Sequence, residues 1–172
     1  MHDFHDSPSP WVMGHAPRIR PGGHVLDLAC GKGRNSFALA AQSFHVLALD
    51  RDPAALSTLH GRQNITSMQA DIEQEAWPLE GQRFDAIIVC RYLYRPLFPT
   101  ILASLSPGGV LIYETFMVGQ ETLGRPSNPD FLLQPGELLA HCSGSLQVVA
   151  FEQGRFEAPD PVYLQRICAI RP

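Results

Sequence analysis

A stretch near the N-terminus, His24 to Ala40, constrains the fold more than any other part of the chain; it reads HVLDLACGKGRNSFALA. The apolar run at 25–28 is typical of a parallel strand that is covered on both faces. Gly31 and Gly33 predict a turn, because glycine takes positive φ freely and lets backbone approach a ligand. Residues 34–41 include good helix formers at 38–41, and such a helix presents free N–H groups and a positive dipole end at the turn. The stretch therefore predicts a strand, a turn and a helix that bind an anionic part of a cofactor.

Two classes of cofactor are bound by such a turn. Dinucleotide-binding proteins use G-x-G-x-x-G, whose third glycine packs the helix against the strand, but Ser36 stands at that position here. Asp27 also lies inside the apolar strand, where a carboxylate is costly without a partner. The ammonium of a methionine moiety would pair with Asp27, whereas a pyrophosphate would be repelled. The alternative is that Asp27 hydrogen-bonds the glycine turn and binds no ligand.

The run LDLACGKGRNS at 26–36, with Asp50 at the end of the next apolar segment, resembles motif I of class I S-adenosylmethionine-dependent methyltransferases. It is especially similar to the tellurite-resistance TehB-like branch of small bacterial methyltransferases. The resemblance weakens after Glu114, and the segment that follows residue 90 departs from that branch. Tellurite is therefore not the acceptor that we expect.

The resemblance implies a role for each cofactor residue. The acid at Asp27 reaches the cofactor's amino group, the two glycines pass its methionine part, and the acid at Asp50 holds the ribose hydroxyls. Asp71 accepts from the adenine amino group and Ile72 packs on the ring; alternatively, Asp71 caps a helix at 72–76. The cofactor-binding set implied for S-adenosyl-L-methionine, and for its product S-adenosyl-L-homocysteine, is Asp27, Ala29, Gly31, Gly33, Asp50, Arg51, Asp71, Ile72 and Cys90.

The alternation of strands and helices predicts an α/β fold. We expect one Rossmann-like, doubly wound domain over 1–172, with a mostly parallel seven-stranded sheet, helices on both faces and a C-terminal antiparallel hairpin. The resemblance implies the strand order 3-2-1-4-5-7-6. The expected strands are 25–28, 45–49, 65–69, 84–90, 110–113, 146–151 and 162–170, and the expected helices are 11–16, 34–41, 54–60, 72–76, 96–105 and 135–141.

The acceptor side is predicted from topology. Ligands of open α/β sheets bind outside the carboxyl ends of the strands, and the strand at 84–90 delivers Arg91, Tyr92, Tyr94 and Arg95 to that edge. We expect Arg91 and Tyr92 to be catalytic and Tyr94 and Arg95 to bind the substrate. In the alternative, the tyrosines cover the core and the arginines are solvated.

Three further features belong to the same edge. Glu114, after the strand at 110–113, is a candidate general base or substrate anchor, or else caps a loop. A helix in the N-terminal cap region, 1–20, brings Trp11 to the cleft or packs it on the sheet. The long irregular segment at 115–134 is expected to be a lid, because loops of that length are usually functional or disordered.

Composition and net charge limit the kinds of partner and metal site that we expect. The net charge is −4 with no basic run, which disfavours nucleic-acid binding and leaves a small-molecule substrate as the expected partner. The four cysteines are scattered without metal-like spacing, so we expect reduced thiols in a cytoplasmic protein and no metal. No segment is typical of a signal peptide or a membrane span. We expect a monomer or a homodimer.

These observations favour methyl transfer by in-line displacement, with a thiol, an oxyanion or a small acid as acceptor. The cofactor carries its own activation, so the protein's main task is alignment. One alternative is a non-catalytic S-adenosylmethionine-binding or partner subunit. An NAD(P)-dependent oxidoreductase is a weaker one, because it predicts a third glycine at Ser36 and no acid at Asp27.

Overall fold

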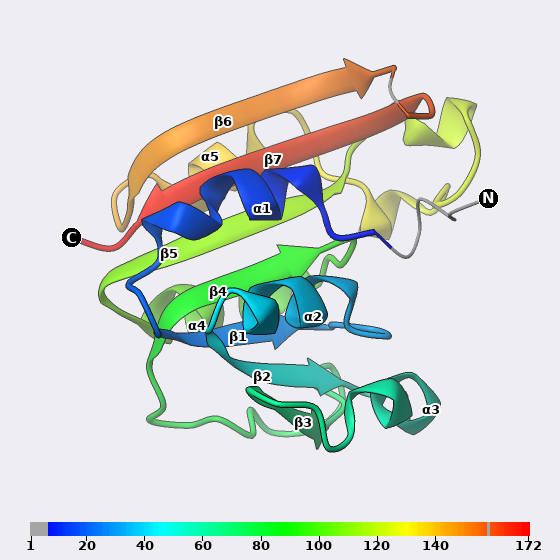
Figure 1. The fold of residues 1–172 in the computed structure, drawn as a ribbon. Helices are drawn as coiled ribbons and strands as arrows, with labels where there is room; N and C mark the ends of the chain where they lie inside the picture. Colours follow the sequence, from blue (N-terminus) through cyan, green and yellow to red (C-terminus); the bar gives the residue numbers. More distant parts are fainter. Residues whose placement is uncertain (1–6, 158) are drawn as a thin grey trace.

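The computed structural model describes residues 7–157 and 159–172, and a seven-stranded sheet forms its centre (Figure 1). The strand order is β3-β2-β1-β4-β5-β7-β6, as predicted. Neighbouring strands from β3 to β5 are parallel, and β7 is antiparallel to both β5 and β6. The strands are β1 His24–Leu28, β2 His45–Asp50, β3 Ile65–Gln69, β4 Phe84–Cys90, β5 Leu105–Phe116, β6 Gln147–Phe156 and β7 Val162–Ile170.

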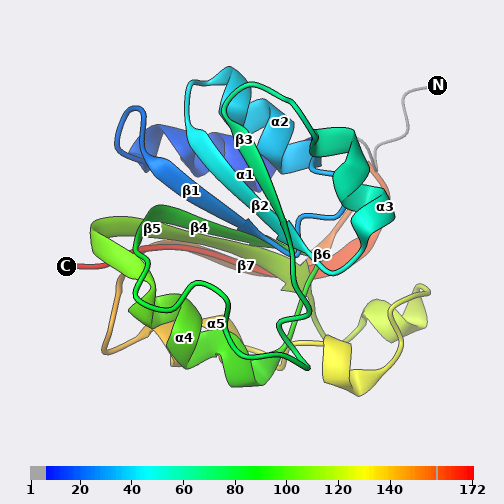
Figure 2. The ribbon, with the colours of Figure 1, turned by 90° about the horizontal axis from the view of Figure 1, so that it is seen from below.

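Helices cover both faces of the sheet (Figure 2). One face packs against the first two helices in a core that includes Val12, Leu39 and Ile88. The opposite face packs against α4 and α5 through residues such as Phe98 and Leu138. Burial on both faces explains why the central strands are continuous apolar runs. The helices are α1 Pro10–His15, α2 Arg34–Ala41, α3 Pro53–Leu56, α4 Phe98–Ala103 and α5 Glu137–Cys142.

Strand β5 is longer than its apolar run predicted. It begins at Leu105, and residues 106–109 form an irregularity inside the strand, where the pairing with β4 shifts register. A side chain at Gly109 would come within 2.9 Å of the carbonyl oxygen of Phe84, so glycine lets the two strands approach there. The hairpin strand β6 likewise extends beyond the predicted 151 to Phe156.

Two of the predicted helices are clearly shorter in the structure, and a third does not form. The helix at 54–60 ends after Leu56 and continues as a 3-10 turn, and the one at 96–105 becomes α-helical only at Phe98. The helix expected at 72–76 does not form. The backbone N–H groups of Gln74 and Glu75 both donate to the Asp71 carbonyl oxygen, at 3.2 and 2.9 Å, which closes a turn instead.

The segment at 115–134 is anchored to the sheet at both ends. Met117 and Leu133 form a parallel bridge, and the Leu133 N–H donates to the Phe116 carbonyl oxygen at 3.0 Å. Leu132 and Leu133 are buried. Two 3-10 turns, Gln120–Thr122 and Pro129–Phe131, lie between the anchors. Its predicted role as a lid stays a prediction.

Among the described residues, no helix has the length and apolar character that crossing a membrane requires.

Candidate active site

A cavity of about 420 Å³ lies where the strands end. Its walls come from residues that end or follow β1, β2, β3, β4 and β5 and from the segment after β5. This is the edge at which open α/β sheets bind ligands. The lining residues are Ala29, Leu49, Asp50, Arg51, Ala70, Asp71, Ile72, Glu73, Arg91, Tyr92, Leu93, Thr115, Phe116, Pro126 and Phe131.

The two glycines of the bend between β1 and α2 have different roles. Gly31 and Gly33 both have positive φ, at 55° and 81°. A Cβ at Gly33 would lie 2.3 Å from Leu59 Cδ2, whereas a Cβ at Gly31 would meet no atom within 4 Å. Gly33 therefore lets the α3 region pack closely, and Gly31 borders open space in which a ligand can approach the backbone.

Asp27 is buried beneath this bend and is 2% exposed. The Ser36 hydroxyl on α2 donates to its Oδ2 at 2.6 Å. Burial raises the pKa of Asp27 from 3.8 to about 6, against the opposing effects of the Ser36 hydrogen bond and the Arg34 charge. Ser36, which occupies the third-glycine position of the dinucleotide pattern, therefore supports a buried carboxylate here.

Asp50 connects the bend to the next strand. Its Oδ2 accepts from the Gly31 N–H at 2.8 Å, and its Oδ1 accepts from the Asp52 N–H at 2.9 Å. Each carboxylate oxygen still has a second lone pair with which to accept a hydroxyl. Asp71 accepts from the Glu73 N–H at 3.1 Å in its own turn, and the neighbouring Ile72 is buried at the cavity wall.

Tyr92 is fixed across the cavity by Glu73, a residue that the sequence did not single out. Its hydroxyl donates to Glu73 Oε1 at 2.9 Å, and its carbonyl oxygen accepts from the Tyr113 hydroxyl at 2.8 Å. Burial, and the Glu73 carboxylate next, raise the pKa of Tyr92. The phenol is therefore protonated at neutral pH and donates this hydrogen bond, so the catalytic role predicted for Tyr92 as a base gains no support from its placement.

Arg91 has φ 56°, a left-handed conformation that is uncommon for a residue other than glycine. Its N–H donates to the Glu114 carbonyl oxygen at 2.8 Å. Its guanidinium lies over the Phe116 ring, 5.8 Å from the centroid. Both Arg91 and Phe116 line the cavity, at the ends of β4 and β5.

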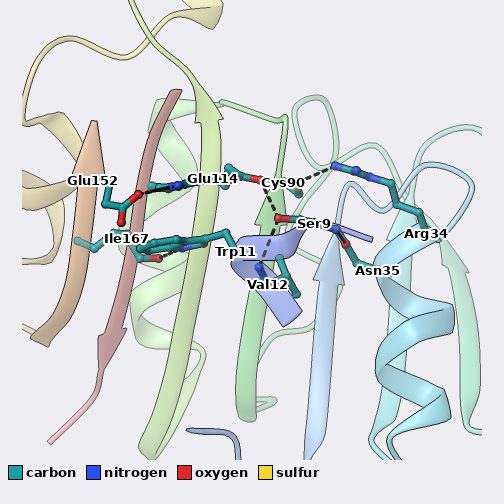
Figure 3. A network of polar contacts seen from close by, with 10 residues as sticks. Ser9, Trp11, Val12, Arg34, Asn35, Cys90, Glu114, Glu152 and Ile167 are labelled. Atoms are coloured by element: carbon teal, nitrogen blue, oxygen red, sulfur yellow. Dashed lines mark hydrogen bonds and ion pairs between the residues drawn. The ribbon is translucent and has the colours of Figure 1, made fainter. Parts of the chain in front are cut away.

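Glu114 lies outside the cavity lining, in the polar network of Figure 3. It is 6% exposed, and its Oε1 accepts from the Ser9 hydroxyl at 2.7 Å. Arg166 lies 3.4 Å from its other oxygen, and the Cys90 thiol is 3.7 Å from Oε1. Burial, and the Glu114 charge next, raise the pKa of Cys90 to about 11, which keeps the thiol protonated. The general-base role predicted for Glu114 gains no support from this placement.

Ser9 connects the network to the N-terminal segment. Its backbone N–H donates to Asn35 Oδ1 at 2.9 Å, and its hydroxyl accepts from the Val12 N–H at 3.3 Å, where it caps α1 (Figure 3). Arg34 donates to the Cys90 thiol at 3.0 Å and to the Ser7 carbonyl oxygen at 2.8 Å. The segment before α1 thus joins the start of α2 to the ends of β4 and β5.

The three residues predicted to bind substrate do not line the cavity. Trp11 is buried on the sheet, and its Nε1 donates to the Ile167 carbonyl oxygen at 3.2 Å, which matches the packing alternative (Figure 3). Tyr94 packs against the core. Arg95 is occupied by both oxygens of Glu137, at 2.6 and 3.0 Å, and by two carbonyl oxygens of the segment after β5.

Seven of the predicted residues therefore meet at one cavity. They are Ala29, Asp50, Arg51, Asp71, Ile72, Arg91 and Tyr92. Asp27, Gly31, Gly33 and Cys90 stand outside its lining, in the adjoining bend and network. The roles assigned to all of these residues stay predictions.

Comparison with known proteins bears on the family and the fold. Residues 25–109 match the family described as "Methyltransferase domain". YqeM of Bacillus subtilis, which carries a methyltransferase name, is 30% identical over 126 residues, covering 66% of this chain and 49% of that protein. The chain thus spans about half of that curated relative. The predicted resemblance to S-adenosylmethionine-dependent methyltransferases is confirmed.

Solved structures confirm the fold. TehB from Haemophilus influenzae superposes with a TM-score of 0.78 at 19% identity, over 94% of this chain and 61% of that one. The glycopeptide N-methyltransferase MtfA, solved with S-adenosyl-L-homocysteine, gives 0.68 at 18% identity, over 99% of this chain and 92% of that one. At these identities the likeness extends to the fold alone.

Proposed function

From the premise that this chain carries an S-adenosylmethionine-dependent methyltransferase domain, we propose that it methylates a small-molecule acceptor. The observation that carries this proposal is the Asp27 carboxylate, buried beneath a two-glycine bend. A buried carboxylate is costly to ionise without a cationic partner. The amino group of a methionine moiety supplies one, whereas a diphosphate adds a second negative charge.

The residues at the cavity fit the rest of the cofactor. Gly31 leaves open space above the backbone, where the methionine part would pass. Asp50 keeps lone pairs for the ribose hydroxyls while it holds the bend. Asp71 and Ile72 lie together on the cavity wall, one with a carboxylate for the adenine amino group and the other with an apolar surface for the ring.

When bound, the sulfonium group supplies the methyl group and its own leaving group. The chain's contribution is to align the acceptor and to exclude water. Tyr92 offers a fixed hydroxyl, Arg91 a cation, and Phe116 and Phe131 apolar surface. Positioning of this kind supplies roughly 7–11 kcal/mol of barrier reduction in well-aligned reactions.

Calorimetry tests the cofactor class. We expect the wild-type chain to bind S-adenosyl-L-methionine and S-adenosyl-L-homocysteine and to bind NADH weakly or not at all. Tight NADH binding without a response to the sulfur compounds would overturn the proposal. Transfer of labelled methyl in a screen of thiols, amines, oxyanions and small acids separates an enzyme from a subunit that only binds the cofactor.

A further inference from the structure

The cavity has two chemically different walls. The wall assigned above to the cofactor carries Asp50 and Asp71 from the ends of β2 and β3. The opposite wall comes from the ends of β4 and β5 and the segment after β5, and it carries Arg91, Phe116 and Phe131. The cofactor assignment does not use the second wall. This inference rests on the proposed function.

The second wall keeps apolar surface in contact with solvent. Phe131 is 50% exposed, and it lines the cavity together with Phe116 and Pro126. Phe131 is the last residue of the 3-10 turn Pro129–Phe131, and the adjoining Leu132 is buried in the core. Exposed aromatic side chains that line a concave site indicate a flat or apolar ligand.

Arg91 puts a cation on this apolar wall. Its left-handed backbone conformation is uncommon for a residue other than glycine, and strained backbone positions of this kind cluster at active sites. The guanidinium lies over the Phe116 ring, so charge and aromatic surface are adjacent. A guanidinium is also a good partner for a carboxylate, because its N–H groups match the two oxygens.

The groups that could remove a proton from an acceptor are already engaged. Tyr92 and Glu73, which both line the cavity, are engaged with each other, because the Tyr92 hydroxyl donates to Glu73 Oε1. The Glu114 carboxylate is buried outside the cavity and accepts from the Ser9 hydroxyl. Among the described residues that line the cavity there is no histidine. The two aspartates of the first wall are assigned to the cofactor. An acceptor that is already ionised at neutral pH needs none of these groups.

We propose that the acceptor is a small carboxylate with a planar apolar body, held by Arg91 and stacked between Phe116 and Phe131, and that the product is its methyl ester. A carboxylate oxygen forms a bond to the methyl carbon while the bond from that carbon to sulfur breaks. The electron pair of the broken bond stays on sulfur. The products are a neutral ester and a neutral thioether, and no proton moves.

Benzoate is a suitable probe for the full chain saturated with S-adenosyl-L-homocysteine. Benzamide keeps the ring without the charge, and acetate keeps the charge without the ring. We expect benzoate to bind at least 10-fold more tightly than either in a calorimetric titration. Equal binding of benzoate and benzamide, or binding of neither, would overturn the inference.

Variants locate the site. Arg91→Gln is expected to weaken benzoate binding about 10-fold, with an unchanged affinity for S-adenosyl-L-homocysteine, and Arg91→Lys is expected to keep the preference for benzoate over benzamide. Phe131→Ala is expected to weaken benzoate binding several-fold. Leu123→Ala is the matched control, since Leu123 is 40% exposed on the same segment but lies outside the cavity lining, and it is expected to have no effect. Equal effects of Phe131→Ala and Leu123→Ala would contradict the placement.

The stability of the product in alkali tests separately whether it is a methyl ester. With S-adenosyl-L-methionine carrying a labelled methyl group, a methyl ester releases labelled methanol in mild alkali, whereas methyl ethers, thioethers and amines do not. Transfer confined to alkali-stable products across a panel of aromatic acids, thiols and amines would overturn the ester assignment. If S-adenosyl-L-homocysteine itself does not bind, the proposed function fails; if it binds and benzoate does not, only the acceptor inference fails.

Discussion

Replacing Asp27 by asparagine should stabilise the protein in the absence of cofactor at neutral pH. Burial raises the pKa of Asp27 from 3.8 to about 6, and each pKa unit corresponds to about 1.4 kcal/mol. Ionising this carboxylate in the folded chain therefore costs about 3 kcal/mol. The Asp27→Asn variant avoids that cost, because its side-chain amide is neutral and the amide oxygen can still accept from the Ser36 hydroxyl.

The direction of the stability difference between Asp27→Asn and wild type depends on pH. A folded-state pKa above the unfolded value means that Asp27 favours folding fully below pH 3.8 and loses that contribution as the pH rises through about 6. Asp27→Asn and wild type should therefore be similarly stable near pH 4. At pH 7.5 the Tm of the variant should lie about 6–12 °C above that of wild type, since about 1 kcal/mol shifts Tm by roughly 2–4 °C in a chain of this size.

Thermal unfolding at both pH values checks this expectation. Asp160→Asn, which removes an exposed carboxylate from the loop between β6 and β7, is the control and should show no such pH-dependent difference. Saturating S-adenosyl-L-homocysteine should reverse the order of stability at pH 7.5, because only wild type gains binding energy at Asp27. A loss of stability in Asp27→Asn that is equal at both pH values would refute the reasoning.

Three other changes test separate parts of the account. Asp50→Ala should weaken S-adenosyl-L-homocysteine binding by about 1.5–3 kcal/mol through lost charge-assisted hydrogen bonds, and an unchanged calorimetric affinity would remove Asp50 from the site. Gly33→Ala should destabilise the chain in urea unfolding by about 1–3 kcal/mol more than Gly31→Ala, because a Cβ at position 33 meets Leu59 and a Cβ at position 31 meets no atom. Equal losses of stability would contradict the packing argument. Arg95→Met should speed hydrogen exchange in the segment after β5, which the guanidinium holds through two carbonyl oxygens, and unchanged protection would show that the segment is held by its apolar anchors alone.

Local patterns allowed most of the fold to be predicted from the sequence. The runs at β3 and β4 and the stretch of helix formers in α2 have the bounds that the structure shows, because each element's apolar pattern and turn residues lie within it. The hairpin that ends the sheet was also predicted, although β6 runs farther than its apolar residues indicate. The irregularity inside β5 was not, since it depends on how close β4 approaches Gly109.

The polar contacts of the site were much less accessible from the sequence. Ser9 and Glu114 are 105 positions apart, and no local pattern pairs them. Arg95 and Glu137 are 42 positions apart. Arg95, which the sequence predicted to bind substrate, contacts Glu137 and two carbonyl oxygens of the segment after β5 instead of lining the cavity. Such contacts depend on the register of whole elements packed together, which spacing within one element cannot give. The contact of Ser36 with Asp27 spans only 9 positions, so it is the one that the strand–turn–helix pattern could have indicated.

A crystal structure of the chain with S-adenosyl-L-homocysteine tests the central claim most directly. We predict the ligand's amino group at Asp27, at about 2.7–2.9 Å as in other charge-assisted hydrogen bonds, and its ribose hydroxyls at Asp50. A ligand whose amino acid part lies away from Asp27, or a bend that binds a diphosphate in its place, would contradict the account.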